Sequence, residues 1–130
     1  MELIYINREI VKIADSLGLI TVDDAEFLKA NVLWIENIQK LKTRGNKSNN
    51  KTSFFATLNL YELDSNKLKL YEIAERFSNG MLNDFFKDES YGYKVTIQKR
   101  NEELRKISAD TGKLYQYSYS FLITTYKLEP

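Results

Sequence analysis

The chain has 130 residues and a mass of 15.3 kDa, which fits one domain over residues 1–130 with a single core. It contains no cysteine and no histidine, so disulfides, thiolate zinc sites and histidine-based catalytic triads are excluded. The remaining carboxylates, lysines and tyrosines form no pattern typical of an active site. We therefore expect a protein that is not an enzyme, with no catalytic residues, no metal ion and no cofactor.

The net charge of +1 is the sum of opposed blocks along the chain. Residues 1–36 carry −4, residues 37–61 carry +5 without any acid, residues 62–90 carry −3 and residues 91–130 carry +3. Positive charge is therefore concentrated in the middle of the chain and in its C-terminal third.

The N-terminal sequence has early acidic residues and too short an apolar run for a secretory signal, and no stretch approaches the roughly 18 apolar residues of a membrane span. We therefore expect a cytoplasmic protein without a membrane partner. The composition, rich in Lys, Asn, Ile and Tyr, is typical of a low-GC genome and fits an accessory protein of a phage or plasmid.

The first predicted element is a helix that begins near Leu3 and ends at Gly18, a natural left-handed cap. Apolar residues recur in it at spacings of three and four, which predicts one buried stripe, made of Leu3, Ile6, Ile10, Ile13 and Leu17.

A second helix is predicted over residues 22–42, because Thr21 and Asp24 resemble a capping box. Together with the first helix it would form a helical hairpin over residues 1–42. Its apolar arc is too wide for one neighbour, so we expect it to pack also on the rest of the domain or on a second copy, as a homodimer. Two adjoining stripes make up this arc: Ala25, Leu28, Val32 and Ile35, and Phe27, Trp34, Ile38 and Leu41.

Residues 43–51 are hydrophilic and rich in turn formers, which predicts a basic loop between the helical hairpin and a mixed region over 52–130. Residues 54–61 then alternate between apolar and other side chains, as a half-buried strand does. A third helix is predicted after a cap at Asp64 and Ser65, with an interruption near Gly80.

Two further strands are predicted over residues 91–98 and 114–128, joined as a hairpin through a turn that places glycine at position 112. Residues 101–107 fit either a helical turn or a strand with a bulge. The predicted fold class is α+β, with an N-terminal helical hairpin packed on an antiparallel sheet of three or more strands and one further crossing helix.

The last strand carries a ladder of aromatic residues on one face: Tyr115, Tyr117, Tyr119 and Phe121. Aromatic residues on a sheet can stack nucleic-acid bases. The opposite face of this strand is polar, however, so the ladder side is the apolar side and we expect helices to cover it.

The outward face would then be polar, basic and partly aromatic, and the basic loop lies beside it in the sequence. The pattern fits a phosphate backbone held by cations while an aromatic residue stacks on a base. We expect a non-catalytic module that binds nucleic acid, single-stranded or with low sequence specificity. The residues predicted to bind are Lys42, Arg44, Lys47, Lys51, Phe55, Tyr61, Lys94 and Arg100.

Three other interpretations remain open from the sequence alone. The basic face and loop also fit an ordinary solvated surface. Acidic pairs such as Asp23 and Asp24 fit a magnesium site only weakly, because a helix start explains this pair. The alternative function is a protein-binding or inhibitory module that acts through a helical surface on an unidentified protein.

Overall fold

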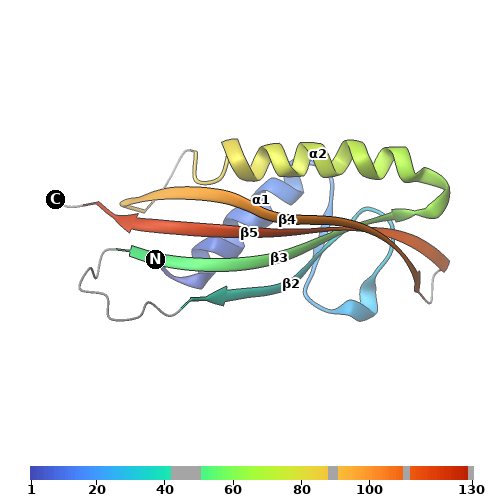
Figure 1. Cartoon of the computed structure of the whole chain (residues 1–130), viewed down its shortest axis with the longest axis horizontal. Helices are drawn as coiled ribbons and strands as arrows, with labels where there is room; N and C mark the ends of the chain where they lie inside the picture. Colours follow the sequence, from blue (N-terminus) through green and yellow to red (C-terminus); the bar gives the residue numbers. More distant parts are fainter. Residues whose placement is uncertain (42–50, 88–90, 110–111, 129–130) are drawn as a thin grey trace.

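The computed structural model describes residues 1–41, 51–87, 91–109 and 112–128. It is an α+β fold in which helices pack on one five-stranded mixed sheet, with strand order β1-β2-β3-β5-β4 (Figure 1). β1 pairs with β2 in parallel, and the other pairs are antiparallel. In chain order the elements are α1 (Leu3–Ser16), β1 (Ile20–Val22), the 3₁₀ turn η1 (Ala25–Phe27), β2 (Val32–Lys40), β3 (Lys51–Leu63), the 3₁₀ turn η2 (Asp64–Asn66), α2 (Lys67–Asn83), β4 (Tyr93–Ala109) and β5 (Gly112–Lys127).

The first predicted helix is confirmed as α1. Its apolar stripe packs on the sheet with Ile6, Ile10 and Ile13 buried, whereas Leu3 at its start is 42% exposed. Gly18 has a φ of +74°, and its N–H donates to the Asp15 carbonyl at 3.1 Å. Glycine adopts this left-handed conformation without steric cost, which explains why the helix ends there.

The predicted helix over residues 22–42 is wrong, and with it the helical hairpin over 1–42 and the dimer through that helix. Residues 20–22 and 32–40 are the strands β1 and β2, and only the short turn η1 is helical between them. Asp24 does act as a cap, because its carboxylate accepts the N–H of Glu26 at 3.0 Å, but the turn that it caps ends at Phe27.

The strand divides each of the two apolar stripes of that segment between its two faces. Leu33 and Ile35 face the helices, whereas Val32 and Trp34 belong to a smaller cluster on the other face. Asn31 precedes them with a φ of +64°, which no helix accommodates in its interior. β2 pairs with β3 from Val32↔Tyr61 to Lys40↔Phe54. This pairing satisfies the backbone N–H and C=O groups that a helix would have satisfied within itself.

The remaining strands agree with the sequence pattern. β4 and β5 form the predicted hairpin, and Gly112 has a φ of +122° at its turn. The ambiguous residues 101–107 belong to β4, and a bulge lies between Lys99 and Asn101. The interpretation as a strand with a bulge is therefore confirmed, and the helical turn is wrong.

The third predicted helix is confirmed as α2, with two corrections in detail. Asp64 and Ser65 lie in η2 and do not cap the helix, whose N-cap residue Asn66 makes no side-chain cap hydrogen bond. Gly80 does not interrupt it, because α2 continues to Asn83.

The main core lies between the helices and one face of the sheet. The aromatic ladder belongs to this face: Phe77 of α2 lies 6.3 Å from Tyr119 and 6.5 Å from Phe121, measured between ring centroids. The Tyr119 hydroxyl donates to the Ala74 carbonyl of α2 at 2.9 Å. The expectation that helices cover the ladder is therefore confirmed, although Tyr115 and Tyr117 are only half-buried.

A second, smaller cluster lies on the opposite face of the sheet. Val32, Tyr61 and Leu114 are buried in it, and Leu28 and Trp34 pack against them. Leu28 comes from the segment between β1 and β2, which therefore covers one end of this face. The side chains of this face towards the other end belong to neither cluster and form a separate surface.

Candidate nucleic-acid interface

We use the term open face for the side of β2, β3, β5 and β4 that faces away from α1 and α2, at the end where β2 and β5 finish and β3 and β4 begin (Figure 1, left). Strand alternation and register place its residues in rows. One row joins Lys51, Tyr126 and Lys94, and another joins Phe55, Leu122 and Gln98.

Phe55 and Leu122 form an apolar patch in the middle of the open face. They are direct cross-strand partners, both are half-buried, and neither belongs to the two core clusters. The surrounding side chains on the same two strands are small and hydroxylated: Ser53, Thr57, Ser120 and Thr124. An aromatic ring among short hydroxyl side chains is accessible to a flat ligand.

The strands of the open face come from parts of the sequence without acidic residues. No Asp or Glu occurs in residues 37–61, 91–101 or 111–128. The sheet register brings these three segments side by side, since β3 pairs with β5 and β5 with β4. The tertiary structure therefore brings lysines of two basic blocks to one end of the sheet, Lys40 and Lys51 of one and Lys94 and Lys127 of the other.

Four exposed lysines lie at this end of the sheet: Lys51 and Lys94 on the open face, and Lys40 and Lys127, which strand alternation places on the side of the helices. The α-amine of Met1 lies near two of them. Burial first, and then the positive charge of Lys40, lower the pKa of this amine, and Lys127 adds to the effect against the opposite influence of Glu2. The lowered pKa reflects mainly the burial of the amine, and the two lysines add to it.

Of the predicted binding residues, the structure brings Lys51, Phe55 and Lys94 together on the open face, and Arg100 is exposed at the bulge of β4. Lys42, Arg44 and Lys47 lie outside the described residues. Tyr61 is 1% exposed, and its hydroxyl donates to Gln116 Oε1 at 2.7 Å. The prediction that Tyr61 faces solvent is wrong, because the segment between β1 and β2 covers it.

Two aromatic residues of the same face were missed by the sequence analysis. Tyr126 is 37% exposed, and the Lys51 ammonium lies 6.0 Å from the centre of its ring. Alternation along β5 from Leu122 through Thr124 places Tyr126 on the polar face, so the sequence did contain this signal. Trp34 was missed because its segment was predicted to be a helix.

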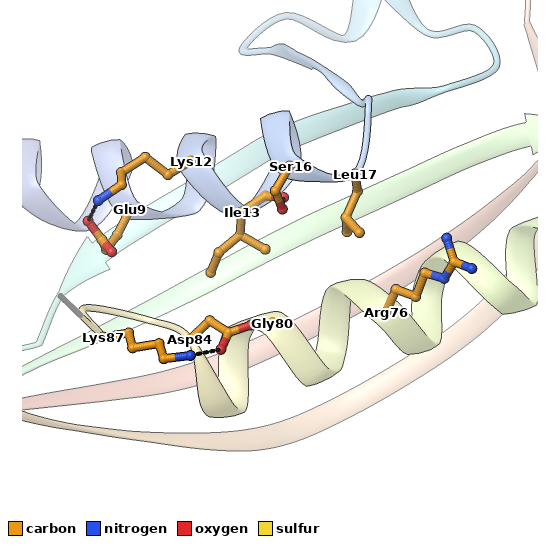
Figure 2. Close-up of a pocket in the computed structure, with 9 residues that line it drawn as sticks. All are labelled: Glu9, Lys12, Ile13, Ser16, Leu17, Arg76, Gly80, Asp84 and Lys87. Carbon is orange, nitrogen blue, oxygen red and sulfur yellow. Dashed lines mark hydrogen bonds and ion pairs between the residues drawn. The ribbon is translucent and has the colours of Figure 1, made fainter.

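The helices carry a separate charged cavity, of about 330 Å³, between α1 and α2 (Figure 2). Its charges are largely compensated within the protein. The Lys12 ammonium lies 3.3 Å from Glu9 Oε2, and the Lys87 ammonium lies 3.9 Å from Asp84 Oδ1. Only Arg76 at the far end has no ion pair among the described residues.

A third polar region lies between α2 and the β4–β5 hairpin, around a cavity of about 420 Å³. Here Glu102 accepts a hydrogen bond from the Tyr117 hydroxyl at 2.9 Å and pairs with Lys99 at 3.5 Å. These charges are again matched in pairs. The open face differs because its lysines have no carboxylate within ion-pair distance among the described residues.

The acidic pairs of the sequence have structural roles where the structure describes them. Asp24 caps η1, and Glu102 and Glu103 lie on opposite faces of β4 because neighbouring strand residues alternate. In the described ranges, no group of three or more acidic side chains is arranged to hold a metal ion.

Comparison with known proteins identifies no family. No protein-family model matches the chain, and no curated protein matches it in sequence. Neither helix in the described part of the chain combines the length and the apolar character needed to cross a membrane.

Proposed function

We propose that this protein is a non-catalytic nucleic-acid-binding module whose binding surface is the open face of the sheet. The observation that carries the proposal is that the acid-free segments 37–61, 91–101 and 111–128 contribute neighbouring strands, with Lys51, Phe55 and Lys94 on the open face. A polyanion that approaches the basic end of this surface meets no carboxylate of these segments, whereas Glu36 of β2 lies near Tyr61, towards the opposite end. Phosphate contacts supply most of the affinity of non-specific nucleic-acid binders.

The connection between β2 and β3 adds to this charge. β2 ends at Lys40 and β3 begins at Lys51, so the intervening residues leave and re-enter the sheet at the basic end. Lys42, Arg44 and Lys47 belong to that connection. We infer that they contact phosphates beside Lys51 and Lys94, while the hydroxyl side chains of β3 and β5 offer neutral hydrogen bonds to the backbone or bases.

Salt dependence tests the proposal directly. Binding of a labelled oligonucleotide, followed by fluorescence anisotropy, should weaken linearly with the logarithm of salt concentration. The slope should be about −0.7 for each phosphate neutralised on a single strand. Absence of binding even at low salt would contradict the proposed function.

A pair of matched double variants locates the surface. Lys51→Ala with Lys94→Ala should reduce the salt slope by roughly 1.4, because two phosphate contacts are lost. Lys29→Ala with Lys113→Ala removes the same charge from exposed residues near the other end of the sheet and should leave the slope unchanged. Equal effects of the two pairs would mean that only net charge matters and that the open face is not the site.

The alternative proposal, a protein-binding or inhibitory module acting through a helical surface, is supported by exposed leucines on α2. Leu68 is 72% exposed and Leu82 is 43% exposed. The wide apolar arc that first indicated such a surface does not exist, because its residues form β2. A protein that binds no oligonucleotide at low salt would favour this second function.

A further inference from the structure

We propose that Trp34, Phe55 and Tyr126 form an aromatic row that stacks the bases of a single-stranded nucleic acid, so that the protein prefers single strands to duplex. This inference rests on the proposed function and specifies its ligand. We refer to these three residues as the aromatic row.

The aromatic row runs diagonally over three neighbouring strands. Trp34 on β2 pairs with Asn59 of β3. Phe55 lies four residues nearer the start of β3 than Asn59. Tyr126 of β5 pairs with Lys51, which is another four residues nearer the start. With a rise of about 3.3 Å per residue and strands about 4.8 Å apart, each step is about 14 Å. The three rings are therefore evenly spaced along one line on one face, with Trp34 half-buried against the small cluster at one end and Tyr126 exposed at the other.

The surroundings of the aromatic row suit a flexible strand. Cross-strand rows of short polar side chains separate the rings, namely Thr57 with Ser120 and Ser53 with Thr124. These residues leave space above the sheet between one ring and the next. Nucleotides between two stacked bases can cross that space, and the phosphates at the Tyr126 end lie near Lys51 and Lys94, which flank Tyr126 in the same cross-strand row.

Duplex nucleic acid does not fit this arrangement, because its bases are already stacked inside the helix and cannot contact protein rings. Stacking on aromatic side chains is the usual mode of sequence-tolerant binding to single strands. The uncharged amide, hydroxyl and aromatic side chains beside the lysines therefore indicate a single strand, since a duplex would meet only the cations.

The length of the aromatic row limits the binding site. Its two steps span about 28 Å, which corresponds to at most about eight nucleotides at the rise of roughly 3.4 Å per stacked nucleotide, and to fewer in an extended strand. Affinity for thymidine oligonucleotides should therefore rise with length and level off by about eight nucleotides.

Trp34 is the only tryptophan of the chain, so its fluorescence reports on one end of the row. We would titrate the full chain at low salt with an eight-nucleotide thymidine strand and with a duplex of the same length. The single strand should quench Trp34 emission and bind at least tenfold more tightly. Equal affinity for the duplex, or unchanged Trp34 emission on binding, would overturn the inference.

Variants of the other two rings complete the test. Phe55→Ala and Tyr126→Ala should each weaken single-strand binding by about 5- to 150-fold, the range expected for one lost base stack. Tyr126→Phe keeps the ring and should bind almost normally, whereas Phe55→Leu keeps apolar bulk without the ring and should still bind weakly. Thermal melting of each variant shows that it is folded.

Tyr71→Ala is the matched control, because Tyr71 is 42% exposed on α2, away from the open face. It should leave binding unchanged. Salt-sensitive binding that ignores Phe55→Ala and Tyr126→Ala would overturn the aromatic row but leave the nucleic-acid function standing. Absence of binding by the wild type at low salt would overturn the function itself, and with it the row.

Discussion

Glu9 is a carboxylate buried between α1 and the residues that follow α2. Its Oε1 accepts the backbone N–H of Phe86 at 2.9 Å, and its Oε2 pairs with the Lys12 ammonium at 3.3 Å (Figure 2). Phe86 has a φ of +54° and cannot continue the helix, so its N–H needs an acceptor from elsewhere. Glu9 therefore joins α1 to the end of α2 through one hydrogen bond.

Two replacements of Glu9 should separate the contribution of its hydrogen bond to stability from the contribution of its charge. Glu9→Ala leaves the Phe86 N–H without its partner and should lower the free energy of unfolding by about 1 to 3 kcal/mol. Glu9→Gln keeps an acceptor oxygen and loses only the pair with the exposed Lys12, so its loss should be below about 1 kcal/mol. Urea unfolding measures both values, and equal losses would assign the effect to charge instead.

Two tyrosine hydroxyls are buried on opposite faces of the sheet, in Tyr61 and Tyr119. Burial, followed by the nearby carboxylate of Glu36, raises the pKa of Tyr61 well above its ordinary value of 10.0. Burial, followed by the neighbouring Tyr117, raises the pKa of Tyr119 in the same way. Both hydroxyls are therefore held in their neutral form by the folded state.

The raised pKa values predict a loss of stability at alkaline pH. Below pH 10.0 both states keep these protons, whereas above it the unfolded chain releases them and the folded protein does not. Each tyrosine should then lower the free energy of unfolding by up to about 1.4 kcal/mol per pH unit. Urea unfolding between pH 8 and about 11 should show that the free energy of unfolding declines less steeply with pH for Tyr119→Phe than for the wild type. Parallel declines would mean that the Tyr119 hydroxyl does not cause the loss of stability.

At the scale of elements, α1 and α2 meet closely at one glycine. A Cβ atom added to Gly80 would lie 2.8 Å from Cγ2 of Ile13. This Cγ2 is attached to Cβ of a β-branched side chain and cannot move far without a shift of the backbone. The position therefore accepts glycine within a helix because of its packing partner.

Gly80→Ala should destabilise the protein, although alanine favours a helix over glycine by about 1 kcal/mol. We expect a net loss of about 1 to 3 kcal/mol from overpacking against Ile13. In a protein that already carries Ile13→Ala the clashing methyl is absent, so Gly80→Ala should be neutral or favourable there. Thermal unfolding of the two single variants and the double variant gives the coupling, and strictly additive effects would mean that the contact is unimportant.

At the scale of the whole molecule, charge and shape are divided between the two sides of the sheet. On the side of the helices, carboxylates pair with lysines: Glu9 with Lys12, Glu62 with Lys69 and Asp84 with Lys87. The open face on the other side has apolar, hydroxyl, amide and basic groups. A weak net charge of +1 therefore conceals an uneven distribution of charge between the two sides of the sheet.

The sequence by itself determined the features that depend on local patterns. Spacings of three and four predicted α1 and most of α2, period two predicted β3 and the β4–β5 hairpin, and glycine marked positions 18 and 112. It also identified the covered side of the aromatic ladder, because polar residues alternate with its tyrosines. Neighbouring residues alone impose each of these features.

The tertiary structure decided the features that depend on distant partners. Residues 32–40 have apolar side chains on both faces, a pattern that fits a helix or a strand until β3 supplies their hydrogen bonds. Coverage of Tyr61 required the segment between β1 and β2 to fold over it. The aromatic row joins Trp34, Phe55 and Tyr126 only through the register of three strands, because residues so far apart in the chain share a surface only when long-range pairing aligns them.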